Sequence, residues 1–122
     1  TRIRPSSLHS SVLAGRTWEL DILTDITERT SAPSGQQAYV TSLNDLQSSN
    51  LYRTTIKLSG SPSTDASGDR RLFIFINGAE LPTTSLIALQ SGDPTDEIKF
   101  DLDYQLTATG STTDTIKVWY SV

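Results

Sequence analysis

The sequence lacks the residues and segments on which several common classes of protein depend. It contains no cysteine, which excludes disulfides, thiolate nucleophiles and cysteine-ligated zinc. Its net charge is -4, and because phosphate binding requires a basic face, nucleic acid is not expected as the main partner. No apolar run approaches the roughly 20 residues of a membrane-spanning helix, so no membrane partner is expected.

Histidine is nearly absent as well, since His9 is the only one in the chain. A Ser-His-Asp site needs a histidine that is held by packing and oriented by a carboxylate. His9 lies in a polar N-terminal stretch that is not expected to hold it in this way. The loop 65–69 lacks both the glycine spacing and the lysine of a phosphate cradle. We therefore predict that the protein is not an enzyme and uses no cofactor.

Serine and threonine are abundant and together supply 34 of the 122 residues. Threonine is β-branched and packs well on a pleated sheet, whereas serine is frequent in turns. This composition favours strands joined by polar loops over a helical bundle. Hydrophobic residues make up only 35% of the chain, so neighbouring subunits are expected to contribute part of the stability.

Alternation of apolar and polar residues predicts most of the secondary structure. Trp18, Leu20 and Ile22 alternate with more polar residues and predict the apolar face of a half-buried strand. Asn77-Gly78 is the favoured type I′ hairpin turn, and Pro82 interrupts the strand that returns from it. The predicted strands cover residues 18–26, 38–43, 51–58, 72–76, 85–90, 97–108 with a break and a hairpin near Asp103, and 114–122, while residues 43–49 form either a helical turn or a loop.

Seven or eight short strands without a convincing amphipathic helix predict an all-β protein. The architecture that fits them is an antiparallel β-sandwich or jelly roll. No internal repeat or second domain is visible, so we predict one sandwich domain over residues 18–122.

Residues 1–17 differ from the rest because they carry arginines and no acidic residue. They are predicted to form an extended N-terminal arm, and a frayed terminus is the alternative. In the first case the arm lies across an acidic neighbouring subunit. The residues expected to contact that partner are Arg2, Arg4, Leu8 and Arg16.

The most informative side chains are aromatic. If the even-numbered residues of the strand 72–76 face the core, then Phe73, Phe75 and Trp119 lie on the opposite face of the sheet, provided that the two strands are neighbours. Such a patch is typical of an oligomer or partner interface. The alternatives are a second sheet that covers the rings and a platform on which a sugar stacks.

An acidic cluster near the end of the chain is the best metal candidate. Calcium needs six to eight oxygen ligands that converge from loops. Three of these residues instead alternate along the outer face of a predicted strand, and the other two fall in a turn, so we predict no metal site. A carboxylate pair for glycoside hydrolysis is disfavoured because nothing places one member in a desolvated pocket. The cluster consists of Asp93, Asp96, Glu97, Asp101 and Asp103.

The sequence also contains two motifs, Phe75-Ile-Asn-Gly-Ala-Glu-Leu81 and Asp114-Thr-Ile-Lys-Val-Trp-Tyr120. Through them, residues 71–122 resemble a recurring pattern in bacteriophage structural proteins, especially tail-fibre, baseplate and head-decoration modules. The sequence departs from that pattern at Pro82-Thr-Thr84, where a short strand is usual. The resemblance implies a virion component, commonly a homotrimer or part of a ring, without catalytic residues.

Chain length and the arm favour one kind of virion component. A single sandwich with a basic arm looks like a capsid cement (decoration) protein that binds the major capsid protein and forms oligomers. The alternatives are a tail adaptor or baseplate component, which binds tail proteins, and a carbohydrate-binding adhesin module, which binds a glycan. The absence of cysteine and of a secretory signal pattern agrees with assembly in the host bacterial cytoplasm and residence in the virion.

Overall fold

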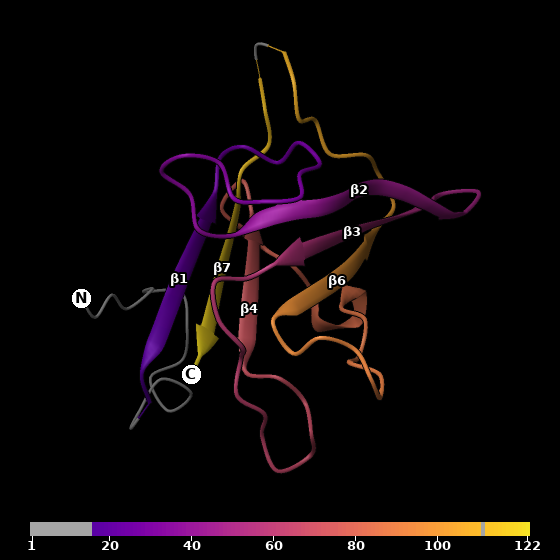
Figure 1. Ribbon diagram of the computed structural model, residues 1–122. Helices are drawn as coiled ribbons and strands as arrows, with labels where there is room; N and C mark the ends of the chain where they lie inside the picture. Colours follow the sequence, from indigo (N-terminus) through magenta and orange to yellow (C-terminus); the bar gives the residue numbers. More distant parts are fainter. Residues whose placement is uncertain (1–15, 111) are drawn as a thin grey trace.

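The computed structural model describes residues 16–110 and 112–122, which form seven strands and one short 3-10 helix (Figure 1). The prediction of an all-β protein is confirmed. The elements are β1 (Trp18–Leu23), β2 (Tyr39–Ser48), β3 (Leu51–Lys57), β4 (Leu72–Ile76), β5 (Ala79–Glu80), η1 (Thr83–Ser85), β6 (Glu97–Leu102) and β7 (Ile116–Ser121).

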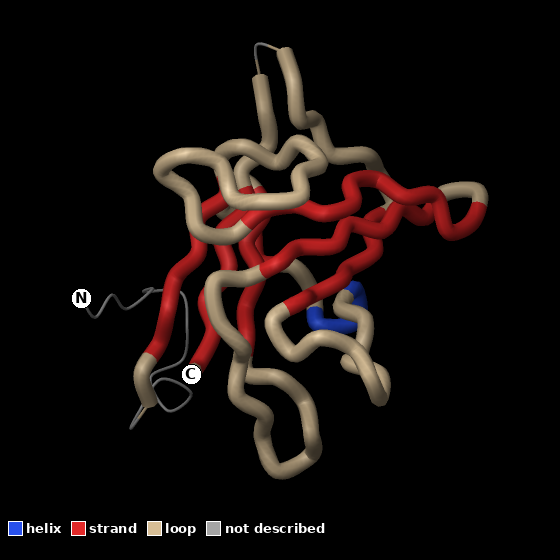
Figure 2. Tube along the Cα trace, viewed as in Figure 1, coloured by secondary structure: helices blue, strands red, loops and turns tan. Residues whose placement is uncertain are grey.

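The strands form two antiparallel sheets. The four-stranded sheet has the order β1-β7-β4-β5, and the three-stranded sheet has the order β2-β3-β6. The strands of one sheet run steeply across those of the other in Figure 1, and Figure 2 shows the long loops that join the two layers. The architecture is therefore sandwich-like, with a shared core between the sheets.

Alternate residues of β4 and β7 fill one side of this core. Ile74 and Val118 are partners in the register between the two strands, and both are almost completely buried. The side chains from the three-stranded sheet that face them include Ile56, Ile98 and Phe100, each with 0% exposure. The predicted division of β4 and β7 into a core face and an outer face is confirmed.

The orientation of β1 differs from the prediction. Asp21 and Leu23 are buried on the core side, whereas Ile22 is 44% exposed on the other face. The alternation of apolar and polar residues predicted the wrong buried face because Asp21 was taken to be exposed. Its carboxylate is instead buried, where it accepts several hydrogen bonds. The strand also ends at Leu23, although Ile26 beyond it is still buried.

The strand β2 is longer than the predicted range 38–43 and includes most of the segment 43–49 that was left open. Its pairing with β3 shifts register three times, and these irregularities break the alternation on which the prediction relied. Asn44 lies at one shift with a φ of 55°, and its amide accepts from the N–H of Leu106 and donates to the Leu106 carbonyl, both at 2.8 Å. This side chain ties β2 to the segment after β6.

The hairpin after β4 follows the predicted type I′ turn, because Asn77 and Gly78 have φ values of 51° and 86°. The predicted strand 85–90 is wrong. After Pro82 the chain forms η1, and then Leu86 makes an isolated bridge with Phe100, so that this segment borders the three-stranded sheet. Proline has no N–H with which to continue the hairpin ladder.

The last two predicted strands are shorter than expected. A break near Asp103 is confirmed because β6 ends at Leu102, but residues 103–108 form no second strand, so the predicted hairpin is wrong. Leu106 is buried in the core instead, where Asn44 binds its backbone. The final strand covers Ile116–Ser121, within the predicted 114–122.

Truncation of a core ring tests this packing. Phe100→Ala removes a ring with 0% exposure and leaves a cavity, so we expect the free energy of unfolding to fall by about 3–5 kcal/mol. The control is Leu46→Ala, because this side chain is 60% exposed. It should change the free energy of unfolding by less than about 0.5 kcal/mol. Urea unfolding followed by tryptophan fluorescence measures both values, and equal effects would contradict the described core.

Candidate functional site

The predicted interface rings gather on one face of the four-stranded sheet. The strands β4 and β7 are neighbours, and Phe73 lies directly opposite Trp119 in their register. Phe75 lies on the same face because it is two residues from Phe73 along the strand. The condition on which the predicted patch depended, that these two strands are adjacent, is therefore met.

Two further side chains, Trp18 and Leu20 from β1, join these rings. The rings of Trp18 and Phe73 have centroids 5.7 Å apart at a tilt of 33°, a favourable aromatic arrangement. The sequence analysis missed both residues because it assigned them to the core face of β1. We call the set Trp18, Leu20, Phe73, Phe75 and Trp119 the outer-face cluster.

The outer-face cluster is separate from the core between the sheets. The three-stranded sheet packs on the opposite face, so within residues 16–110 and 112–122 no second sheet covers the rings, unlike in one of the alternatives. Trp18, Phe75 and Trp119 are nevertheless only 5%, 8% and 6% exposed, whereas Leu20 and Phe73 are half-buried. The Nε1 of Trp18 is buried without a hydrogen-bond partner among the described residues, although buried indole N–H groups usually have one.

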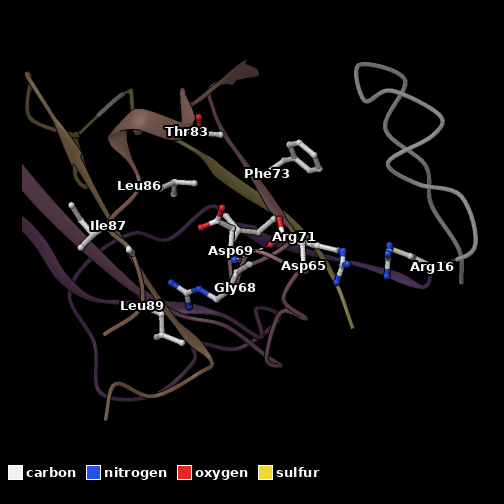
Figure 3. Close-up of a pocket in the computed structure, with 13 residues that line it drawn as sticks. Arg16, Asp65, Gly68, Asp69, Arg71, Phe73, Thr83, Leu86, Ile87 and Leu89 are labelled. Carbon is white, nitrogen blue, oxygen red and sulfur yellow. Dashed lines mark hydrogen bonds between the residues drawn. The ribbon is translucent and has the colours of Figure 1, made fainter. Parts of the chain in front are cut away.

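A groove adjoins this cluster at Phe73, which lines both (Figure 3). Its volume is about 700 Å³, within the range of ligand sites in proteins. It lies between the loop 65–71, the first half of β4 and the segment 83–89. Its lining includes three arginines, Arg16, Arg70 and Arg71, together with apolar side chains from β4 and the segment after η1.

The structure describes one of the four predicted arm contacts. Arg16 is exposed and lines the groove. The other three, Arg2, Arg4 and Leu8, lie outside the described residues, as does His9. Sequence reasoning did not predict the groove, because the loop, strand and segment that form it are far apart along the chain.

Two of the acidic residues considered as metal ligands form ion pairs with cations of β3 instead. The carboxylate of Asp101 accepts from Arg53 at 2.8 Å, and that of Asp96 accepts from the Lys57 ammonium at 2.8 Å. These hydrogen bonds raise the pKa of both cations above its ordinary value. In the part of the chain that the structure describes, no three acidic or histidine side chains come together as metal ligands.

A buried polar network connects the sheet to the loop after β3. The Asp21 carboxylate, 4% exposed, accepts from the N–H of Ser59 at 2.9 Å and from the Tyr120 hydroxyl at 3.1 Å. The hydroxyls of Ser59 and Tyr120 are 2.6 Å apart. Burial, above all, raises the pKa of Tyr120 to about 12, although the Ser59 hydrogen bond acts in the opposite direction.

This network anchors the loop because each member has partners within the chain. Among the described residues, the Ser59 hydroxyl contacts the Asp21 carboxylate and the Tyr120 hydroxyl. The network therefore serves to fix the position of the β3–β4 loop on β1 and β7.

No family model, curated protein or solved structure matches this chain. Among the described residues, no helix is long and apolar enough to cross a membrane.

The raised pKa of Tyr120 predicts that stability decreases at high pH. The folded state holds this phenol neutral up to about pH 12, whereas an unfolded tyrosine ionises near pH 10. The stabilisation is complete below about pH 10 and is lost as the pH rises toward 12, by about 2–3 kcal/mol in the free energy of unfolding.

Urea unfolding of the wild type and of Tyr120→Phe at several pH values between about 9 and 12 measures this loss. The variant should lack this part of the decline, whereas the control Tyr52→Phe should keep it. A decline of the same size in Tyr120→Phe would show that other groups cause it.

Proposed function

We propose that this protein is a non-enzymatic assembly protein that binds other proteins through the outer face of its four-stranded sheet. The observation that supports this function best is the outer-face cluster, which gathers aromatic side chains on the face away from the core. Protein interfaces are enriched in tryptophan and phenylalanine, and a few such rings contribute most of the binding energy.

The accessible part of this face combines apolar side chains with the exposed cation Lys117 of β7. Leu20 and Phe73 are half-buried, and Ile22, on the same face of β1, is 44% exposed. The nearly buried rings beside them provide a rigid base, so a partner would dock against side chains that lose little conformational freedom. This arrangement suits an interface better than it suits a reaction centre.

Within this class we propose a structural virion protein of a bacteriophage, with a jelly-roll type of sandwich and an N-terminal arm. The support is the sequence resemblance over residues 71–122, together with the absence of acidic residues from 1–17. The favoured role is a capsid cement protein that forms a trimer or a ring on the shell, and a tail adaptor or baseplate component is the alternative.

The glycan-binding alternative is less well supported. Sugars stack on an accessible aromatic face, and Trp119 is only 6% exposed. Tyr52 is half-buried and belongs to the other sheet, so it does not extend the outer-face cluster.

If the outer face is an interface between copies, a polar residue there should dissociate the oligomer. We expect the wild type to sediment as a trimer or larger ring at tens of micromolar, and Phe73→Ser to weaken this association by about tenfold or more, as for the loss of a central aromatic contact. Leu46→Ser, at a side chain that is 60% exposed on β2, is the control and should associate like the wild type. A wild type that stays monomeric would contradict self-assembly.

The proposed role of the arm has its own test. Deletion of residues 1–15 removes no residue of β1 and keeps Thr17, whose carbonyl accepts from the Val122 N–H, and thermal unfolding of the shortened protein checks that the sheet is intact. We expect the shortened protein to lose co-sedimentation with purified shells of the phage that encodes it. Replacement of Arg2 and Arg4 by glutamine should weaken this binding in part and make it less sensitive to salt. Unchanged binding of both variants would exclude the arm from the contact.

A further inference from the structure

We propose that Asn77 is a covalent modification site, at which slow deamidation by water releases the β4–β5 hairpin from the start of β7. The folded structure holds this reaction back through hydrogen bonds to the Asn77 side chain, and the product of the reaction cannot form the same bonds. The site is distinct from the outer-face cluster and from the groove, and it goes beyond the proposed function without depending on it.

The reactive sequence is the dipeptide Asn77-Gly78. Of the three asparagines in the chain, Asn44, Asn50 and Asn77, only Asn77 precedes a glycine. Because glycine has no Cβ, its backbone nitrogen is the least hindered in approaching the side-chain amide of the residue before it. Both residues are exposed at the tip of the hairpin, so solvent water has access to the reacting atoms.

The chemistry needs no reagent other than water. The backbone nitrogen of Gly78 loses its proton and attacks Cγ of Asn77, so a new C–N bond forms and the bond from Cγ to Nδ2 breaks. The leaving nitrogen takes up a proton and departs as ammonia, which leaves a succinimide ring. Water then opens the ring at either of its carbonyls and gives an aspartyl or an isoaspartyl linkage. The net change is the exchange of an amide for a carboxyl group, without oxidation or reduction.

Three hydrogen bonds hold Asn77 against the segment that leads into β7. Its Nδ2 donates to Oδ1 of Asp114 at 2.7 Å, and its Oδ1 accepts from the Thr115 N–H at 2.9 Å. Its backbone N–H donates to the Thr115 carbonyl at 2.9 Å. Oδ2 of Asp114 accepts from the Thr107 N–H at 2.7 Å, so this carboxylate is itself fixed in position. We call the contacts among Asn77, Thr107, Asp114 and Thr115 the hairpin clamp.

The hairpin clamp opposes closure of the succinimide ring. Bonding of Cγ to the Gly78 nitrogen requires rotation about the side-chain and ψ torsions of Asn77, which breaks both side-chain hydrogen bonds and distorts the type I′ turn. The charge of Asp114, 2.7 Å from Nδ2, also disfavours the negative charge that develops on the attacking nitrogen and on Oδ1. Asn77 therefore reacts when this end of the sheet opens locally.

The product of the reaction cannot restore the hairpin clamp. A carboxylate at position 77 has no N–H to donate, and Oδ1 of Asp114 is also an acceptor. Two like charges would then face each other in place of the present 2.7 Å hydrogen bond and repel. An isoaspartyl linkage also adds a backbone carbon to the turn that pairs Ile76 with Ala79. Deamidation therefore separates the hairpin from β7.

The first test compares reaction rates in the full chain. Folded protein and protein unfolded in guanidinium chloride are incubated at one pH and temperature, and mass spectrometry of proteolytic fragments measures deamidation and isoaspartate at position 77. A deamidated product should accumulate in the folded protein, but at least about tenfold more slowly than in the unfolded chain, because two side-chain hydrogen bonds have to break.

Variants identify the hairpin clamp as the cause of the slow reaction. Folded Asp114→Ala should react about fivefold faster than the wild type or more, as for the loss of one hydrogen bond. Asp96→Ala is the matched control, since it removes an acidic partner of Lys57 in the other sheet, and it should react like the wild type.

The second test examines the product. Asn77→Asp should lower the midpoint of thermal unfolding by about 4 °C or more. The double variant Asn77→Asp/Asp114→Asn exchanges the amide and the carboxylate and should recover the wild-type midpoint. Its amide at position 114 can donate to the carboxylate at position 77 and still accept from the Thr107 N–H.

The proposal is overturned if no deamidated product accumulates in the folded protein, or if the folded and unfolded chains react at the same rate. It is also overturned if folded Asp114→Ala reacts no faster than the wild type, or if the double variant is no more stable than Asn77→Asp. Should Asp114→Ala fail to fold, the double variant decides, because it retains the hydrogen-bonding groups that Asp114→Ala removes.

Discussion

The antiparallel pairing of β4 with β7 is the contact on which the rest of the molecule depends. Its register sends alternate residues of both strands in opposite directions, so the same two strands supply one wall of the core and most of the outer-face cluster. The strand β1 can add its tryptophan to that cluster only because β7 also pairs with it on its other edge. A slip of one residue in this pairing would exchange the two faces and bury Lys117 among the core side chains.

The sequence predicted the central strands well and their neighbours less well, for physical reasons. The run 72–76 is apolar throughout and ends in Asn77-Gly78, so both its existence and its turn follow from local chemistry. The orientation of β1 does not follow locally, because the burial of Asp21 depends on Tyr120 and Ser59, which are far away in the sequence. The bulges of β2 hide its length, since each shift in register reverses the alternation.

The candidate sites also differ in how far the local sequence predicts them. The rings of Phe73 and Trp119 were predictable because period-two alternation fixes their face once the strands are paired. The groove was not predictable from the sequence, because its arginines come from the start of the described chain and from the β3–β4 loop. Its leucines come from a third segment, which was predicted to be a strand. Pro82 was recognised as an interruption, but the 3-10 turn η1 that follows it was not predicted.

The pairing of β1 with β7 joins nearly the first and nearly the last described residues, since Trp18 lies opposite Ser121. During synthesis the long segment between β1 and β7 must therefore emerge before this sheet can close, and contacts so distant in sequence form slowly. Until Ile116–Ser121 leaves the ribosome, Trp18, Phe73 and Phe75 lack the ring of Trp119 that packs among them. The nascent chain thus passes through a stage in which these side chains are exposed to solvent and open to premature association.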